Sequence, residues 1–95
     1  MKLKPITYMA ACYPSPKPRK GYAISHPDIP KWMHLCVVCI EKYTWFIDHY
    51  ETGCYVTEAS TRAEAIRTVV DLSKERWFLD AMKKLGFGPK ARGAA

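Results

Sequence analysis

Apolar and polar residues follow two different periods along the chain, and the change falls near residue 60. The stretch 32–40 (Trp-Met-His-Leu-Cys-Val-Val-Cys-Ile) is rich in strand-forming residues, and 44–50 (Thr-Trp-Phe-Ile-Asp-His-Tyr) is its expected antiparallel partner. Gly53 can adopt the positive φ that a tight hairpin needs, so a further short strand is expected over 54–57. This half of the chain is therefore predicted to form two or three antiparallel strands.

From Thr61 onward the apolar residues follow a helical spacing. Thr61 and Glu64 match a capping box, and Gly86 is a natural left-handed stop. We expect one long helix over 61–85, bent near Ser73. Because Trp77 and Phe78 are adjacent, both cannot point into one core, so the N-terminal segment or a partner must cover one of them. The apolar positions are Ile66, Val69, Val70, Leu72, Trp77, Leu79, Met82 and Leu85.

Prolines are concentrated at the start of the chain. Six of the seven fall within residues 1–30, and proline removes a backbone donor and restricts the residue before it. Residues 13–20 are therefore expected to form an extended polyproline II arm, with 6–13 as a candidate edge strand. The predicted fold class is α+β: a two- or three-stranded antiparallel sheet with one long helix packed on one face, plus an extended Pro-rich N-terminal arm. The predicted parts are a Pro-rich basic arm at 1–31, a ββ(β)α domain at 32–87 and a basic flexible tail at 88–95.

The strand register decides which side chains form the core. A four-residue loop over 41–44 would place Cys36 opposite His49 and Val38 opposite Ile47. The core face would then collect Met33, Leu35, Val37, Cys39, Phe46, Tyr50, Cys54 and Val56, with Asp48 as its misfit. The other face would collect His34, Cys36, Val38, Ile40, Trp45, Ile47, His49 and Tyr55. A slip of one residue would exchange these roles.

Charge is unevenly distributed along the chain. The net charge is +6, with basic ends and an acidic hairpin, since residues 33–60 hold Lys42 against four acids. This pattern is compatible with a solubilising surface, or with attraction to phosphate or to an acidic protein. The residues proposed for partner binding are basic or aromatic: Lys17, Arg19, Lys20, Trp45, Arg67, Lys74, Trp77, Phe78, Lys83 and Lys84.

Cysteine and histidine offer a third kind of chemistry. Under the register above, His34, Cys36 and His49 share a face and could hold a metal ion, whereas structural thiols and surface imidazoles are the alternative. Cys36 and Cys39 have zinc-knuckle spacing, but an extended strand sends them to opposite faces. No catalytic motif accompanies these residues, so neither an enzyme nor a cofactor is predicted. The cysteine spacing favours the cytoplasm, and no apolar run approaches the ~18 residues of a membrane span.

Residues 46–85 resemble the HicB-type antitoxin domain, a small ββ(β)α module. The resemblance is carried by the Gly53-Cys54 step, by Thr61-Arg62-Ala63-Glu64-Ala65-Ile66 at the helix start and by Lys84-Leu85-Gly86 at its end. The family's Pro-Asp step before the glycine is replaced by His49-Tyr50-Glu51-Thr52, and no DNA-binding module follows. The resemblance implies a binding and inhibiting role, and it names no partner.

Three functions are compatible with these patterns. The first is a small non-enzymatic inhibitor or adaptor of a host protein or nucleoprotein complex, such as a phage-type anti-CRISPR or an antitoxin-like regulator. The alternative is a protein that binds nucleic acid directly through the basic arm and helix, and the third is a small zinc-binding or thiol protein. Within the arm, 6–13 is expected to be structural and 14–20 to contact the partner. The oligomeric state is open, with a dimer among the alternatives.

Overall fold

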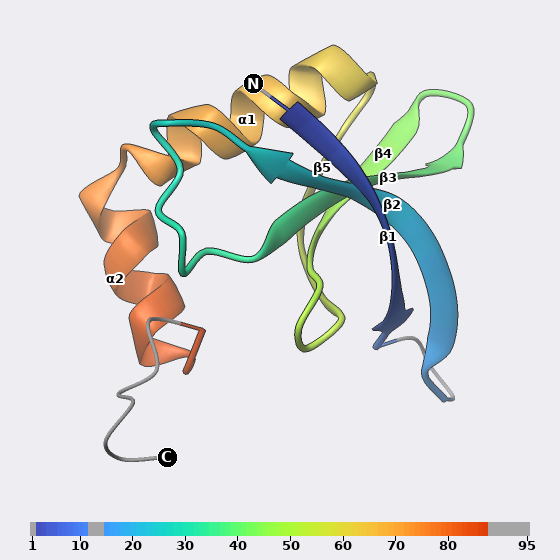
Figure 1. Cartoon of the computed structure of the whole chain (residues 1–95), viewed down its shortest axis with the longest axis horizontal. Helices are drawn as coiled ribbons and strands as arrows, with labels where there is room; N and C mark the ends of the chain where they lie inside the picture. The colour runs from blue at the N-terminus through green and yellow to red at the C-terminus, as the bar shows by residue number, and fades with distance from the viewer. Residues whose placement is uncertain (1, 12–14, 88–95) are drawn as a thin grey trace.

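The computed structural model describes residues 2–11 and 15–87 (Figure 1). A five-stranded antiparallel sheet is followed by two short helices, which makes the protein a small α+β fold. Each strand pairs with its neighbour in the sequence, so the sheet order follows the chain order. The elements are β1 (Lys2–Ala10), β2 (Lys17–Ser25), β3 (Leu35–Glu41), β4 (Thr44–His49), β5 (Cys54–Ala59), α1 (Arg62–Ser73) and α2 (Arg76–Lys84). The tail predicted at 88–95 lies outside the described residues.

The predicted sheet of two or three strands with an extended N-terminal arm is wrong, because the N-terminal region supplies two strands. β1 and β2 pair from Lys2 opposite Ser25 to Ala10 opposite Lys17. β1 is an edge strand, and β2 pairs with β3 only at Tyr22 and Ala23. Pro5 and Pro18 therefore lie where a strand has a neighbour on one side only, a position that tolerates a missing donor.

The outer half of the β1–β2 hairpin bends across the sheet face opposite the helices. Figure 1 shows both strands as long and strongly curved. At Gly21 the backbones approach so closely that a Cβ atom would lie 2.8 Å from the Val37 carbonyl oxygen. Beyond β1, the Ala11 N–H donates a 2.8 Å hydrogen bond to the Gly53 carbonyl oxygen in the turn before β5. The end of β1 is thereby fixed to the turn between β4 and β5, although β1 and β5 are the two edge strands of the sheet.

The predicted register of the central hairpin is off by one residue. Only Lys42 and Tyr43 separate the paired residues Glu41 and Thr44, and Tyr43 adopts a φ of 66°. The register then shifts by one residue between Cys39 and Glu41, so Val37 faces Ile47 and Leu35 faces His49. These four side chains share the face covered by the helices. The main core there contains Ile29, Met33, Leu35, Val37, Ile47, Ala59, Ala65, Ile66, Val69, Phe78 and Met82.

The single long helix predicted over 61–85 is also wrong, because two helices are separated after Ser73. The buried Ser73 hydroxyl donates to the Val69 carbonyl oxygen at 2.7 Å, a bond that competes with the helical ladder. Both predicted helix limits are confirmed. The Thr61 side chain caps α1 by accepting from the Glu64 N–H, and Gly86 ends α2 with a φ of 86°.

Candidate functional site

The fifth strand forms an open edge of the sheet. β5 pairs with β4 on one side, and no other strand of the described chain pairs with its outer side. An edge of this kind presents backbone N–H and C=O groups that another extended chain can use. Tyr55 and Glu58 of this strand are exposed, and the Tyr55 hydroxyl donates to Glu58 at 2.9 Å. The strand therefore offers both main-chain groups and an acidic side chain to solvent.

A groove of about 320 Å³ adjoins this strand at its contact with the helices. Its wall is made of uncharged residues from three elements. The chain changes direction after Ser73, and α2 thereby forms the last part of this wall. Phe78 is buried, whereas its neighbour Trp77 is 62% exposed, and the two rings meet edge to face at 5.8 Å. The lining residues are Val56 and Thr57 from β5, Thr68 and Leu72 from α1, and Trp77 and Phe78 from α2.

A polar network occupies the opposite face of the sheet. The Tyr8 hydroxyl donates to Asp48 Oδ2 at 2.6 Å, and Arg19 Nη1 donates to the same oxygen at 2.9 Å. The Arg19 guanidinium also lies 5.7 Å from the centre of the Phe46 ring. Asp48 was predicted as a misfit on the core face, but it lies on the face opposite the helices. It is fully buried there and is paired, as a buried charge must be.

Burial determines the protonation of Tyr8 and Cys36 on this face of the sheet. Burial first, and then the hydrogen bond to Asp48, raises the pKa of Tyr8 above its ordinary value of 10.0. Burial raises the pKa of the Cys36 thiol from 9.0 to about 11. At neutral pH both groups hold their protons, and a buried protonated thiol is a poor nucleophile. The network is consequently suited to holding the hairpin in place.

Two of the three candidate metal ligands meet, but the third lies on the other face. The His34 and His49 rings lie 6.4 Å apart edge to face, and His49 stacks on Phe87 at 4.2 Å on the helix side, whereas Cys36 packs with Tyr8 and Ala10. His34 Nδ1 is 3.0 Å from the Tyr50 hydroxyl. The predicted shared face is therefore wrong, and its cause is the one-residue shift in register. Among the described residues, no three His, Cys, Asp or Glu side chains are grouped to hold a metal ion.

The basic residues proposed for binding lie on several elements. Arg19 belongs to the Asp48 network, and Lys74 lies 3.2 Å from Asp28. Lys83 lies 5.7 Å from the Trp32 ring, and Trp45 is half-buried against the main core. The other four are exposed: Lys17 and Lys20 on β2, Arg67 on α1 and Lys84 on α2.

Of the predicted site residues, the structure brings Trp77 and Phe78 together at one cavity. The other four lining residues were not predicted from the sequence, because their meeting depends on the break between the helices. One signal was present: Thr68 interrupts the apolar positions of α1 one turn before Leu72. A polar residue there is typical of a helix that is only partly covered.

No family model, curated protein or solved structure matches the chain. Within residues 2–11 and 15–87, neither helix has the length and apolar character needed to cross a membrane.

Proposed function

We propose that this protein acts by binding, as a non-enzymatic inhibitor or adaptor that captures an extended segment of a partner protein. The observation that carries the proposal is the exposed Trp77 ring beside an apolar groove at an open strand edge. Exposed aromatic rings next to a pocket are the residues that most often dominate binding energy. Open strand edges bind extended segments through main-chain hydrogen bonds.

The bound segment would run along β5. Its backbone would extend the sheet, and one of its apolar side chains would enter the groove against Val56 and Leu72. Trp77 would then close over that side chain and lose its exposure to water. The exposed Glu58 favours a segment with a basic residue next to its apolar anchor.

The experiment is a selection of short random peptides against the full chain. Enriched peptides should contain an apolar anchor with Lys or Arg beside it. Trp77→Ala should weaken their binding by about 2 kcal/mol, roughly 30-fold. Tyr43→Asn is the matched control, because Tyr43 is 70% exposed at the other end of the sheet and Asn tolerates its positive φ. Equal binding by wild type and Trp77→Ala would refute the proposal.

The proposed partner is a host protein or nucleoprotein complex, and the proposed location is the cytoplasm. A phage-type inhibitor or an antitoxin-like regulator would act in this way. The resemblance of residues 46–85 to the HicB-type domain stays a prediction, and it agrees with a binding role.

A further inference from the structure

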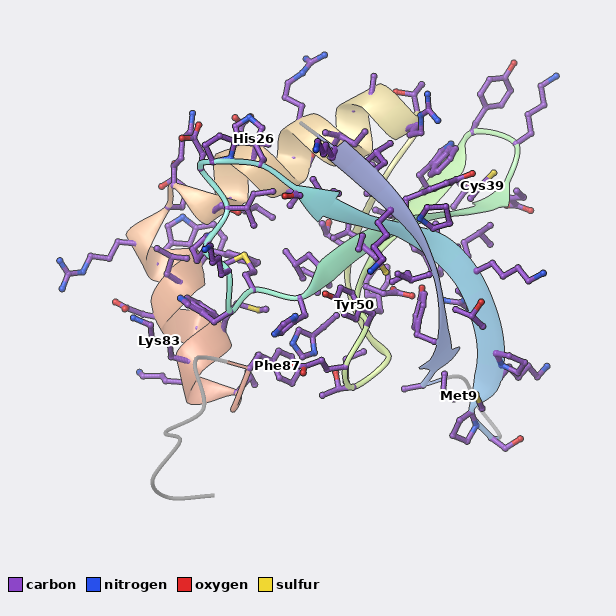
Figure 2. The ribbon with its side chains drawn as sticks, viewed as in Figure 1. Met9, His26, Cys39, Tyr50, Lys83 and Phe87 are labelled. Atoms are coloured by element: carbon purple, nitrogen blue, oxygen red, sulfur yellow. The ribbon has the colours of Figure 1, made fainter. Side chains whose placement is uncertain are left out.

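A second pocket, of about 610 Å³, lies where β1 begins, β2 ends and β3 begins. The loop between β2 and β3 forms one wall, and the end of β4 forms the other. Figure 2 shows His26 on that loop and Tyr50 just after β4. The lining residues are Lys2, Ile24, Ser25, His26, Pro27, Ile29, Lys31, Met33, His34 and Tyr50.

The lining is rich in hydrogen-bond donors and contains no carboxylate. Lys2 and Lys31 are exposed, and neither forms an ion pair with another residue of the described chain. The Asp28 N–H donates to His26 Nδ1 at 3.0 Å, so the neutral ring carries its proton on Nε2 and can donate from there. Two lysines and a histidine donor without an acceptor of their own are suited to an anion.

The two carboxylates nearest in sequence are already engaged. Asp28 Oδ2 lies 3.2 Å from Lys74 Nζ and 3.9 Å from His26 Nδ1, and Glu51 lies 3.5 Å from His34 Nε2. Lys74 offsets the charge of Asp28, so the two lysines of the rim exceed the single charge of Glu51. The pocket therefore keeps a net positive rim.

Other lining residues give the pocket an apolar floor. Ile29 and Met33 are buried in the main core, and Ile24 packs against the same core. The rings of His34 and Tyr50 meet edge to face at 5.4 Å beside this floor. An inorganic ion would use the rim alone, whereas a ligand with a flat apolar body and an anionic group would use both surfaces.

We propose that this pocket binds a nucleotide, with its base on the apolar floor and its phosphate at Lys2 and Lys31. Such a nucleotide can be free or can be one unit of a single strand of nucleic acid, because both present the same base and phosphate. The site is separate from the Trp77 groove and does not depend on peptide binding there.

Calorimetric titration of the full chain tests this site with three probes: adenosine monophosphate, a single-stranded oligonucleotide and inorganic phosphate. Lys2→Gln combined with Lys31→Gln should weaken nucleotide binding roughly tenfold or more. Lys42→Gln combined with Arg62→Gln is the control, since it removes the same charge from exposed residues elsewhere. Thermal unfolding of both double variants verifies that each is folded.

A free-nucleotide site would be established if adenosine monophosphate binds and only the Lys2→Gln, Lys31→Gln variant weakens its binding. Binding of the oligonucleotide alone, with the same variant dependence, would establish a nucleic-acid site. The proposal is overturned if neither probe binds or if both double variants lose affinity equally. It is also overturned if phosphate binds as tightly as the nucleotide, because the apolar floor would then contribute nothing.

Discussion

Tyr8 and Asp48 are 40 residues apart in the chain, yet they are joined inside the protein by a 2.6 Å hydrogen bond. The Tyr8 hydroxyl is the donor and the fully buried Asp48 carboxylate is the acceptor. This bond connects an edge strand, β1, with the fourth strand of the same sheet. The outer half of the first hairpin is consequently held across the sheet by a charge-assisted bond in addition to apolar packing.

Replacing Tyr8 with Phe should lower the free energy of unfolding by about 2 kcal/mol, because a buried charged acceptor loses a donor while the ring is kept. Urea denaturation measures the change. Tyr55→Phe is the matched control, since its hydroxyl bonds Glu58 at the exposed surface and should contribute less than about 0.5 kcal/mol. Equal losses in the two variants would show that the buried bond does not anchor the hairpin.

Alkaline pH should destabilise the fold, beginning with Cys36. The thiol has a pKa of about 11 in the folded protein and 9.0 as its ordinary value, so the unfolded chain releases this proton first as pH rises. Below pH 9 the thiol is protonated in both states, and its contribution to the free energy of unfolding is fully present. Between pH 9 and pH 11 that free energy declines by about 1.4 kcal/mol per pH unit. Tyr8 adds to the decline above pH 10.

Cys36→Ala isolates the contribution of the thiol. Urea denaturation at intervals between pH 9 and 10 should give a free energy of unfolding that falls more steeply with pH for wild type than for the variant. A slope that is identical in the two proteins would assign the alkaline sensitivity to other groups.

Two glycines with similar backbone angles should respond differently to alanine. Gly53 and Gly86 have φ values of 77° and 86°. A Cβ atom at Gly86 meets nothing within 4 Å, whereas one at Gly53 would collide with the Met9 carbonyl oxygen at the end of β1. Gly86→Ala should therefore lower the unfolding free energy by about 1 kcal/mol, and Gly53→Ala by about 3 kcal/mol.

Thermal or urea unfolding compares the two glycine variants directly. A loss at Gly53 no larger than that at Gly86 would mean that β1 does not pack against this turn.

Local signals in the sequence predicted the ends of elements well. Gly53, Thr61 and Gly86 each adopt the expected conformation, because turn and cap geometry depends on a few adjacent residues. The central register was missed for a different reason. The turn pairs Glu41 with Thr44, which agrees with the predicted register, but the strand shifts by one residue between Cys39 and Glu41, and no turn or cap residue marks that shift.

Tertiary contacts overrode local preference at two other places. Pro5 and Pro18 suggested an arm outside the sheet, but the strands around them have a free side and Tyr8 fixes the hairpin across the core. The predicted long helix is interrupted after Ser73, whose buried hydroxyl bonds the Val69 carbonyl oxygen. The adjacency of Trp77 and Phe78 did indicate an uncovered aromatic ring. The groove beside it could not be predicted without the turn between the helices.

Amide hydrogen exchange, followed by NMR with a selected peptide bound, is the decisive measurement for the proposed addition of a partner segment to β5 beside Trp77. Exchange should slow for outward-facing amides of Cys54–Ala59, and the Trp77 indole N–H resonance should shift. Tyr43→Asn should keep both effects, and Trp77→Ala should lose the slowed exchange at equal peptide concentration. Peptide-induced protection confined to other strands, with the Trp77 resonance unmoved, would rule out binding of the peptide at β5.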